Sequence, residues 1–374
     1  MKQTGSEYIA DFLESKNIDT IFTVAGDHIL HIMDILSKRG FKFIDTRHEQ
    51  AAVDMANAWG RIKQKPGITM FTTPGHANAI PGLTLAHQQL SPIINITGCA
   101  DSKLLGMGAA QEIDQVGMAK PVTKRSEIIL NGNQIVSNLE ASYQISLSGR
   151  RGPTHLTIPT NLQSQSYDKN DMSFQSRING SSVINPDFSH QKIIEYLKKS
   201  SNPIIILGNG AHDVLSDEII NLVETLNIPI LTEMSARGII PDSHYLCFGL
   251  SDQRANPIAR VISESDLVIL LGKELDFTLD FGNHPVISKS SYIIQVDPDE
   301  QILSRSKRAD LSILSSVGNF VSQIVRNLNY YKDYKKSPDI LKSLEIESQN
   351  HHSSLEKYRN DIESIHSMDI HFAL

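Results

Sequence analysis

The sequence predicts an α/β protein with two doubly wound domains, each a mainly parallel sheet flanked by helices. Short β-branched runs alternate with helical patterns over residues 1–160, which is typical of right-handed βαβ units. A second block of the same kind begins near Pro203. Between the two blocks lies a segment rich in Ser, Asn, Asp and Gln, a composition that indicates a linker.

The first block opens with Thr4 and Glu7 at the spacing of a capping box, which predicts a helix near the N-terminus. A strand is predicted at 20–24, and the apolar spacing over 29–36 predicts a helix that Gly40 ends. Further strands are predicted at 41–44, 68–71, 93–97 and 155–158.

The second block begins with the apolar run 203–207, which predicts a buried strand. Further elements are predicted as strands at 229–231, 267–271 and 292–296 and as a helix at 317–328. Beyond Tyr330 the sequence is charged and weakly periodic, which is typical of a linker and surface helices.

Charge and cysteine content exclude several classes of protein. The 374 residues carry 35 Lys and Arg against 42 Asp and Glu, a net charge of −7. Because contacts with phosphates require a basic excess, we expect no nucleic-acid partner. The two cysteines cannot form a disulfide framework, and no apolar run approaches the ~18 residues of a membrane span. We therefore expect a cytoplasmic protein with no membrane partner.

Three polar segments are candidates for a functional site, and the first two adjoin predicted strands. Residues 47–50 (RHEQ) follow one strand and open a helix, at the strand end where α/β proteins bind ligands; a surface ion pair with a helix cap explains them equally well. Residues 72–78 (TTPGHAN) predict a tight turn before a helix starting near Ile80, either beside a ligand or as an ordinary connection. Residues 111–114 (QEID) lie in a stretch too long for a simple connection.

Taken in order, these segments resemble the thiamine-diphosphate-dependent enzymes of the acetolactate synthase type. That group includes acetolactate synthase, benzaldehyde lyase and oxalyl-CoA decarboxylase. The resemblance covers nearly the whole chain, and the ordered set is more specific than any single motif. Its motifs are TVAGD (23–27), RHEQAA (47–52), TTPGHAN (72–78), QEID (111–114), GRRGPTHLTIPTNLQ (149–163), LGNGA (207–211) and QVDPD (295–299).

The resemblance implies a catalytic role for Glu49. Its carboxyl would hydrogen-bond a ring nitrogen of the cofactor's aminopyrimidine and so promote formation of the thiazolium ylid. Pro74, Gly75 and Asn78 match a loop that lies beside this ring. These four residues are therefore the predicted cofactor contacts.

Three further residues are predicted to face the substrate. His76 stands where many relatives carry a small or apolar residue, and His28 lies in the Gly26-Asp27-His28 turn. For each histidine, a helix cap or a partly buried, satisfied imidazole is the alternative. Gln111 matches a glutamine that approaches the catalytic glutamate or the substrate in relatives.

The central block resembles a domain that holds FAD or ADP in some relatives and nothing in others. The turn 208–210 (GNG) could cradle a phosphate, but it lacks the third glycine of a dinucleotide fingerprint. Residues 273–276 (KELD) stand where FAD-binding relatives place an arginine. We therefore expect a nucleotide-free or ADP-like site rather than FAD.

Relatives hold Mg²⁺ and the cofactor's diphosphate through a third domain with a Gly-Asp-Gly motif, and that motif does not occur in this sequence. We predict no metal ligands here. The predicted segments are 1–165, a pyrimidine-binding domain; 166–189, a linker; 190–329, a central domain; and 330–374, a linker and the start of a diphosphate-binding domain that is otherwise missing.

The predicted function is therefore part of an acetolactate synthase-like enzyme, acting by ylid attack on a 2-oxo acid with decarboxylation and carboligation, and inactive as this chain alone. A C–C lyase, an acyl-CoA decarboxylase and a non-catalytic homologue are the alternatives, and the retained Glu49 favours an enzyme. The small residues over 51–56 suggest a homodimer. The other expected partners are a 2-oxo acid substrate and a separate diphosphate-binding chain.

Overall fold

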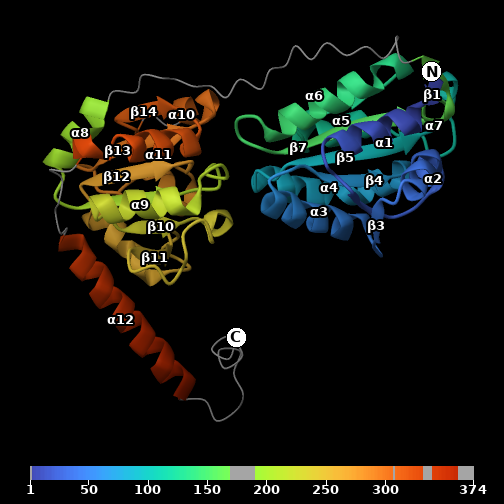
Figure 1. Cartoon of the computed structure of the whole chain (residues 1–374). Coiled ribbons are helices and arrows are strands. Elements are labelled where there is room, and N and C mark those ends of the chain that lie inside the picture. The colour runs from blue at the N-terminus through green and yellow to red at the C-terminus, as the bar shows by residue number, and fades with distance from the viewer. Residues whose placement is uncertain (1, 169–189, 306–307, 332–338, 361–374) are drawn as a thin grey trace. The chain divides into compact units, whose positions relative to one another are not determined.

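The computed structural model describes residues 2–168, 190–305, 308–331 and 339–360. The chain divides into two compact units, residues 1–182 and residues 183–374 (Figure 1). Each unit is built around one six-stranded parallel sheet. The predicted fold class, two parallel α/β domains flanked by helices, is therefore confirmed.

The sheet of the first unit has the strand order β3-β2-β4-β5-β7-β6. Its strands are β2 Thr20–Thr23, β3 Lys42–Asp45, β4 Gly67–Phe71, β5 Ile93–Cys99, β6 Arg125–Ile128 and β7 Pro153–Pro159. The order of connection reverses between β2 and β4. The carboxyl ends of these two strands therefore form the topological switch point, where open α/β sheets usually bind ligands.

Helices cover both faces of this sheet (Figure 1). Apolar side chains of α1, α2 and α6 pack on one face with Ile21 of β2, whereas α3 and α4 pack on the other with Phe22, because successive side chains of a strand point to opposite faces. The helices are α1 Gly5–Ser15, α2 Leu30–Lys38, α3 Glu49–Lys63, α4 Thr73–Gln88, α5 Gln115–Ala119, α6 Ile135–Leu147 and α7 Thr160–Ser164.

The sheet of the second unit has the order β11-β10-β9-β12-β13-β14, and its switch point lies between β9 and β12. Its strands are β9 Pro203–Leu207, β10 Ile230–Thr232, β11 Cys247–Leu250, β12 Leu267–Leu271, β13 Tyr292–Asp297 and β14 Leu311–Leu314. The helices are α8 His190–Lys199, α9 Ser216–Leu226, α10 Glu300–Arg305, α11 Val317–Arg326 and α12 Asp339–Asn360.

One layer of the second unit is formed by α8, α9 and α11. The other contains the 3₁₀ segment η6 Pro257–Glu264 and the first turns of α12, whose Ile340 and Leu344 are buried. Among the described residues no helix is both long and apolar enough to cross a membrane.

Two local predictions are wrong. Residues 72–78 are not a turn before a helix at Ile80, because α4 begins at Thr73 and tolerates Pro74 in its first turn, where a missing N–H costs no helical hydrogen bond. Residues 166–168 are not linker but β8, which pairs antiparallel with β1 (Lys2–Thr4). The rest of the predicted linker, 169–189, lies outside the described residues, and the domain boundaries stay a prediction.

Candidate active site

Glu49 is the first residue of α3, directly after β3 and the cap His48. The His48 Nδ1 accepts a hydrogen bond from the backbone N–H of Gln50 at 3.2 Å, which fixes the start of the helix. Glu49 is half-buried, and its Oε2 accepts a hydrogen bond from Asn78 Nδ2 at 3.0 Å. A carboxylate at the first turn of a helix is also stabilised by the helix dipole.

Gly75 makes room for this carboxylate. A Cβ added at Gly75 would lie 2.7 Å from Glu49 Oε1, so any side chain there would push the carboxyl away. One heptad further along α4, a Cβ at Gly82 would lie 2.8 Å from Cβ of Val53. The glycines of α4 therefore let α3 and α4 approach closely and bring Glu49 and Asn78 together.

This arrangement fits the aminopyrimidine contact that the resemblance implies. Asn78 donates a hydrogen bond to Oε2 of Glu49, and within the described parts of the chain no hydrogen bond reaches Oε1. Oε1 lies against Gly75, where a Cβ would clash with it, and Pro74 and Asn78 are exposed. The predicted residues Glu49, Pro74, Gly75 and Asn78 thus lie together at the start of two adjacent helices. Their role in cofactor binding stays a prediction.

His28 lies on the 3₁₀ segment η1 (Asp27–Ile29), directly beyond β2 at the switch point. Its Nδ1 is 3.2 Å from Oγ1 of Thr73, the first residue of α4. Burial lowers the pKa of His28, and the adjacent Asp27 carboxylate offsets part of that effect. The side chain is half-buried, so a substrate-facing role stays a prediction.

His76 does not face a substrate, and that prediction is wrong. The side chain is fully buried, its Nδ1 is 2.9 Å from Asn95 Nδ2 and its Nε2 is 3.1 Å from the Gln115 carbonyl. Its ring stacks on that of His155 with centroids 4.2 Å apart. The helical phase of α4 points His76 inward, so it is a satisfied core histidine.

This buried pair makes the stability of the first unit depend on pH. Burial lowers the pKa of His76 to about 4, with the Gln115 carbonyl partly opposing, and burial with His76 nearby holds the pKa of His155 well below 6.5. The unfolded chain therefore binds more protons below pH 6.5. The stabilisation is complete above that value and is lost as the pH falls toward 4, by about 3 kcal/mol for His76 alone.

Urea unfolding of the first unit between about pH 7.5 and pH 4.5 checks this expectation. The unfolding midpoint should fall with pH, and replacing the exposed His31 by Gln should leave that dependence unchanged. A midpoint that stays constant or rises on acidification would contradict it.

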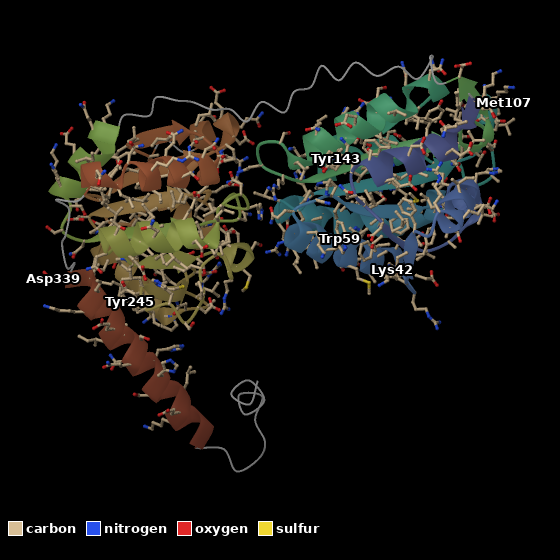
Figure 2. The ribbon with its side chains drawn as sticks, viewed as in Figure 1. Lys42, Trp59, Met107, Tyr143, Tyr245 and Asp339 are labelled. Carbon is tan, nitrogen blue, oxygen red and sulfur yellow. The ribbon has the colours of Figure 1, made fainter. Side chains whose placement is uncertain are left out.

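Gln111 is exposed, with φ +61°, in the loop between β5 and α5. The adjacent Glu112 fixes this loop by accepting hydrogen bonds from the backbone N–H groups of Gly106 and Ala109, and these bonds lower its pKa. Figure 2 shows Met107 at the surface of the same loop, where 75% of it is exposed. The hydrogen bonds described here do not join Gln111 to Glu49, so its predicted approach stays untested.

The sequence interpretation missed two residues near His28: Thr73, which contacts it, and Gln115, which contacts Thr73. Gln115 Nε2 donates to Thr73 Oγ1 and to the Gly98 carbonyl, each at 3.2 Å. We call His28, Thr73 and Gln115 the switch-point cluster. No sequence signal marked Gln115, because it lies just outside the QEID motif. Thr73 was overlooked because it lies inside the segment that was predicted as a turn.

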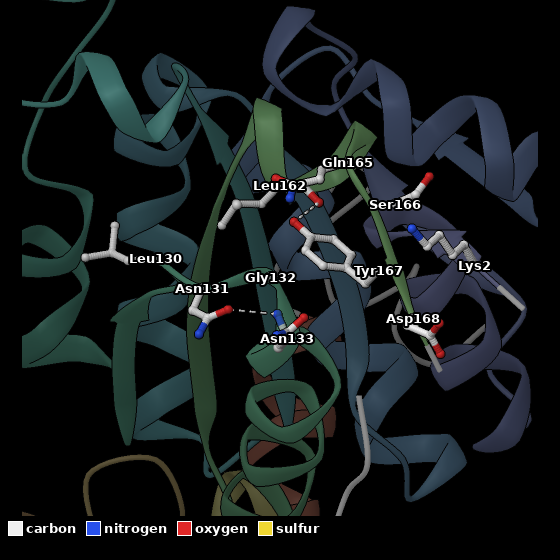
Figure 3. Close-up of a pocket in the computed structure, with 10 residues that line it drawn as sticks. All are labelled: Lys2, Leu130, Asn131, Gly132, Asn133, Leu162, Gln165, Ser166, Tyr167 and Asp168. Carbon is white, nitrogen blue, oxygen red and sulfur yellow. Dashed lines mark hydrogen bonds between the residues drawn. The ribbon is translucent and has the colours of Figure 1, made fainter. Parts of the chain in front are cut away.

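A separate cleft of about 690 Å³ opens in the first unit near β1 and β8 (Figure 3). Asn131 Oδ1 accepts the N–H of Asn133 beside it, and Tyr167 donates to the Leu162 carbonyl. None of the predicted site residues lines this cleft, so it is distinct from the arrangement around Glu49.

The switch point of the second unit does not fit the phosphates of FAD or ADP. A Cβ at Gly208 would lie 2.4 Å from the Gly272 carbonyl oxygen, so the two backbones fill the crevice. The Asn209 N–H donates to the Glu233 carboxylate rather than being free for a phosphate. The fully buried Lys273 lies 2.5 Å from Asp276 and 3.7 Å from Glu233.

A neighbouring cleft of about 410 Å³ has no excess of positive charge with which to bind the phosphates instead. Its charged lining consists of Glu274, Asp276, Arg305 and Arg308, and Arg305 is paired with Glu274 at 2.7 Å. Asp297, which follows β13, is fully buried and so does not reach a ribose. We therefore derive no role for FAD or ADP.

Over the residues that the structure describes, no group of three or more His, Cys, Asp or Glu side chains is arranged to hold a metal ion.

Comparison with known proteins gives two family matches. The model described as "Thiamine pyrophosphate enzyme, N-terminal TPP binding domain" matches residues 3–118. The model described as "Thiamine pyrophosphate enzyme, central domain" matches residues 190–324. One match therefore falls in each of the two blocks that the sequence analysis distinguished.

Curated relatives point the same way. A probable acetolactate synthase large subunit of Methanococcus aeolicus is 29% identical over 347 residues, covering 90% of this chain and 57% of the relative. A 2-hydroxyacyl-CoA lyase of Saccharomyces cerevisiae is 31% identical over 343 residues, covering 88% and 59%. The acetolactate synthase isozyme 1 large subunit of Escherichia coli is 26% identical over 328 residues, covering 86% and 57%. The chain thus spans less than three fifths of these relatives.

Proposed function

Because the chain belongs to the thiamine pyrophosphate enzyme family, we propose that it provides the aminopyrimidine-binding side of an active site for 2-oxo acids. The leading reaction is an acetolactate synthase-like decarboxylation and carboligation. One observation carries this proposal: the Glu49 carboxyl is held by a hydrogen bond from Asn78 and packs against Gly75, where any side chain would displace it.

Thiamine diphosphate, when bound, supplies a nucleophilic carbon for attack on a substrate carbonyl. In this proposal Asn78 orients the Glu49 carboxyl by donating to Oε2. The Glu49 carboxyl would share a proton with a ring nitrogen of the aminopyrimidine, a role that an amide could not perform. The exposed Pro74 would form the adjacent surface against which the ring packs, and Gly75 leaves room for the Glu49 carboxyl.

A C–C lyase is the second candidate, favoured by the 31% identity to a 2-hydroxyacyl-CoA lyase. Both reactions use the same Glu49 role, so they differ in the substrate-facing residues. An acyl-CoA decarboxylase and a non-catalytic homologue are the remaining alternatives.

We also propose that the diphosphate and Mg²⁺ are bound by residues outside these 374. The sequence contains no Gly-Asp-Gly motif, and Mg²⁺ bridges carboxylate and phosphate oxygens. A diphosphate-binding region of a second subunit or separate chain would then complete the site around Glu49 and Asn78. Apolar side chains on the helices that carry Glu49 and Asn78 support this: Met55, Ile62 and Leu85 are 47%, 79% and 40% exposed.

The proposed location is the cytoplasm, since both cysteines, Cys99 and Cys247, are free, as a reducing compartment favours.

Turnover tests the proposal directly. The full chain would be incubated with thiamine diphosphate, Mg²⁺ and pyruvate, alone and with a Gly-Asp-Gly-bearing fragment of a relative. We expect CO₂ and acetolactate only in the mixture, together with association of the two chains in sedimentation. Cleavage of a 2-hydroxyacyl-CoA instead would favour the lyase. If the mixture neither turns over nor binds the cofactor, the non-catalytic alternative stands.

A further inference from the structure

His76 and His155 form a stacked pair in the core of the first unit, and their hydrogen bonds reach α5. Both side chains are fully buried, and their ring planes lie 19° from parallel. Burial lowers the pKa of both rings below 6.5, so each ring is neutral at pH 7 and carries one hydrogen. The groups around each ring decide which nitrogen carries it.

The hydrogen of His76 lies on Nε2. That nitrogen is 3.1 Å from the Gln115 carbonyl oxygen, which can only accept. The other nitrogen, Nδ1, then has no hydrogen and accepts from Asn95 Nδ2 at 2.9 Å. The orientation of the Asn95 amide agrees with this, because its oxygen accepts from Thr69 Oγ1 at 2.8 Å. His76 therefore accepts from the sheet and donates to the backbone of α5.

The hydrogen of His155 lies on the opposite nitrogen, Nδ1. Ser126 Oγ is 2.8 Å from this nitrogen and 3.0 Å from the Val116 carbonyl oxygen. Because the carbonyl can only accept, the Ser126 hydroxyl donates its single hydrogen there and accepts from His155. Nε2 of the ring then accepts from Thr97 or Thr157, whose hydroxyl oxygens lie 2.9 and 3.1 Å away.

The stacked pair thus holds the first two residues of α5, one carbonyl directly and the other through the Ser126 hydroxyl. The helix has only five residues, Gln115–Ala119, and so short a helix gains little stability from its own hydrogen bonds. It begins where the loop that carries Gln111 ends, and the side chain of its first residue belongs to the switch-point cluster.

We propose that His76 and His155 are positioning residues, which fix the start of α5 and with it the loop between β5 and α5. His76 does so by donating from Nε2 and His155 by donating from Nδ1. An apolar side chain in place of His76 would remove both the donor to the Gln115 carbonyl and the acceptor for Asn95. An effect of this loop on substrate rests on the proposed function, whereas the anchoring of α5 does not.

Nitrogen NMR of the full chain with ¹⁵N-labelled histidine tests the hydrogen positions, because two-bond correlations distinguish the two neutral forms. Sequence-specific assignment identifies both rings in the wild type, so the result does not depend on a variant that folds. We expect hydrogen on Nε2 of His76 and on Nδ1 of His155. The opposite form of either ring would overturn the proposal.

Hydrogen exchange of the full chain tests the anchoring. His76→Leu should raise exchange of the loop amides that donate to Glu112 about tenfold, the effect of one lost hydrogen bond. The amides of β4 serve as an internal reference and should exchange as in the wild type. No rise in the loop, or an equal rise in β4, would overturn the proposal, because a general loss of stability affects the whole sheet.

Three further variants sharpen this test. His76→Gln keeps an N–H donor at the end of the side chain and should restore part of the protection. Thr84→Val, elsewhere on α4, is the matched control and should match the wild type. Should His76→Leu fail to fold, Ser126→Ala applies the same test to the second contact, since it removes the hydroxyl between His155 and Val116.

Kinetics test the effect on substrate. In the active mixture, His76→Leu should raise KM about tenfold and leave kcat within about threefold of the wild type, because Glu49 and Asn78 are unchanged. His76→Gln should recover part of the lost affinity. An unchanged KM would overturn the role in positioning the loop for substrate. If the wild type itself shows no turnover, the proposed function fails, and NMR and exchange still decide whether the pair anchors α5.

Discussion

Replacing Glu49 with Gln should reduce turnover by at least about 100-fold, because an amide cannot exchange the proton that the aminopyrimidine contact requires. The fold should persist, since a Gln side-chain oxygen still accepts the hydrogen bond that Asn78 donates to Oε2. The measurement is kcat for the mixture described above, with deuterium exchange at the thiazolium carbon as a second readout.

Glu264→Gln is the control for this substitution, because Glu264 is exposed in the second unit. Glu49→Asp adds a graded variant that keeps the carboxyl but shortens its reach by one methylene, and it should retain part of the activity. Wild-type exchange and turnover in Glu49→Gln would refute the role given to this carboxyl.

Replacing Gly98 with Ala should destabilise the first unit by about 3 kcal/mol, a fall in thermal midpoint of roughly 6–12 °C. A Cβ at Gly98 would lie 1.9 Å from the His28 backbone oxygen. Neither backbone can move freely, because β5 is buried in the sheet. Scanning calorimetry measures the shift.

Gly152→Ala is the matched control for that change. Its Cβ would lie 3.0 Å from Lys124 Cδ and 3.7 Å from His87 Nδ1, which are side-chain atoms and not backbone, so the midpoint should move by less than about 2 °C. Equal melting of Gly98→Ala and the wild type would show that the His28 turn does not depend on close approach to β5.

The strands predicted from apolar runs agree closely with the structure, and two of them, 203–207 and 267–271, have the same bounds as β9 and β12. Continuous apolar runs mark strands buried on both faces. The edge strands β6 and β14 were not predicted: only Ile128 of β6 is apolar, and Ser312 interrupts the short apolar run of β14.

The position of Glu49 after a strand was predictable, since strand ends and helix starts leave local signals. The inward direction of His76 was not, because it depends on where α4 begins. Because residues 72–78 were interpreted as a turn, the sequence analysis could not assign His76 and Asn78 to different faces of one helix. The hydrogen bonds of Gln115 depend on contacts between β5 and α4 that no local pattern encodes.

The closely packed crevice of the second unit has a consequence for how the stability of this unit depends on ligand concentration. The buried Lys273 there is paired with Glu233 and Asp276 of the same chain. A domain that binds a ligand in its native state has a lower free energy of unfolding when the ligand is scarce, since bound ligand adds to that free energy. Because the buried Lys273 is paired with carboxylates of this chain, we expect the stability of the second unit not to depend on a bound anion.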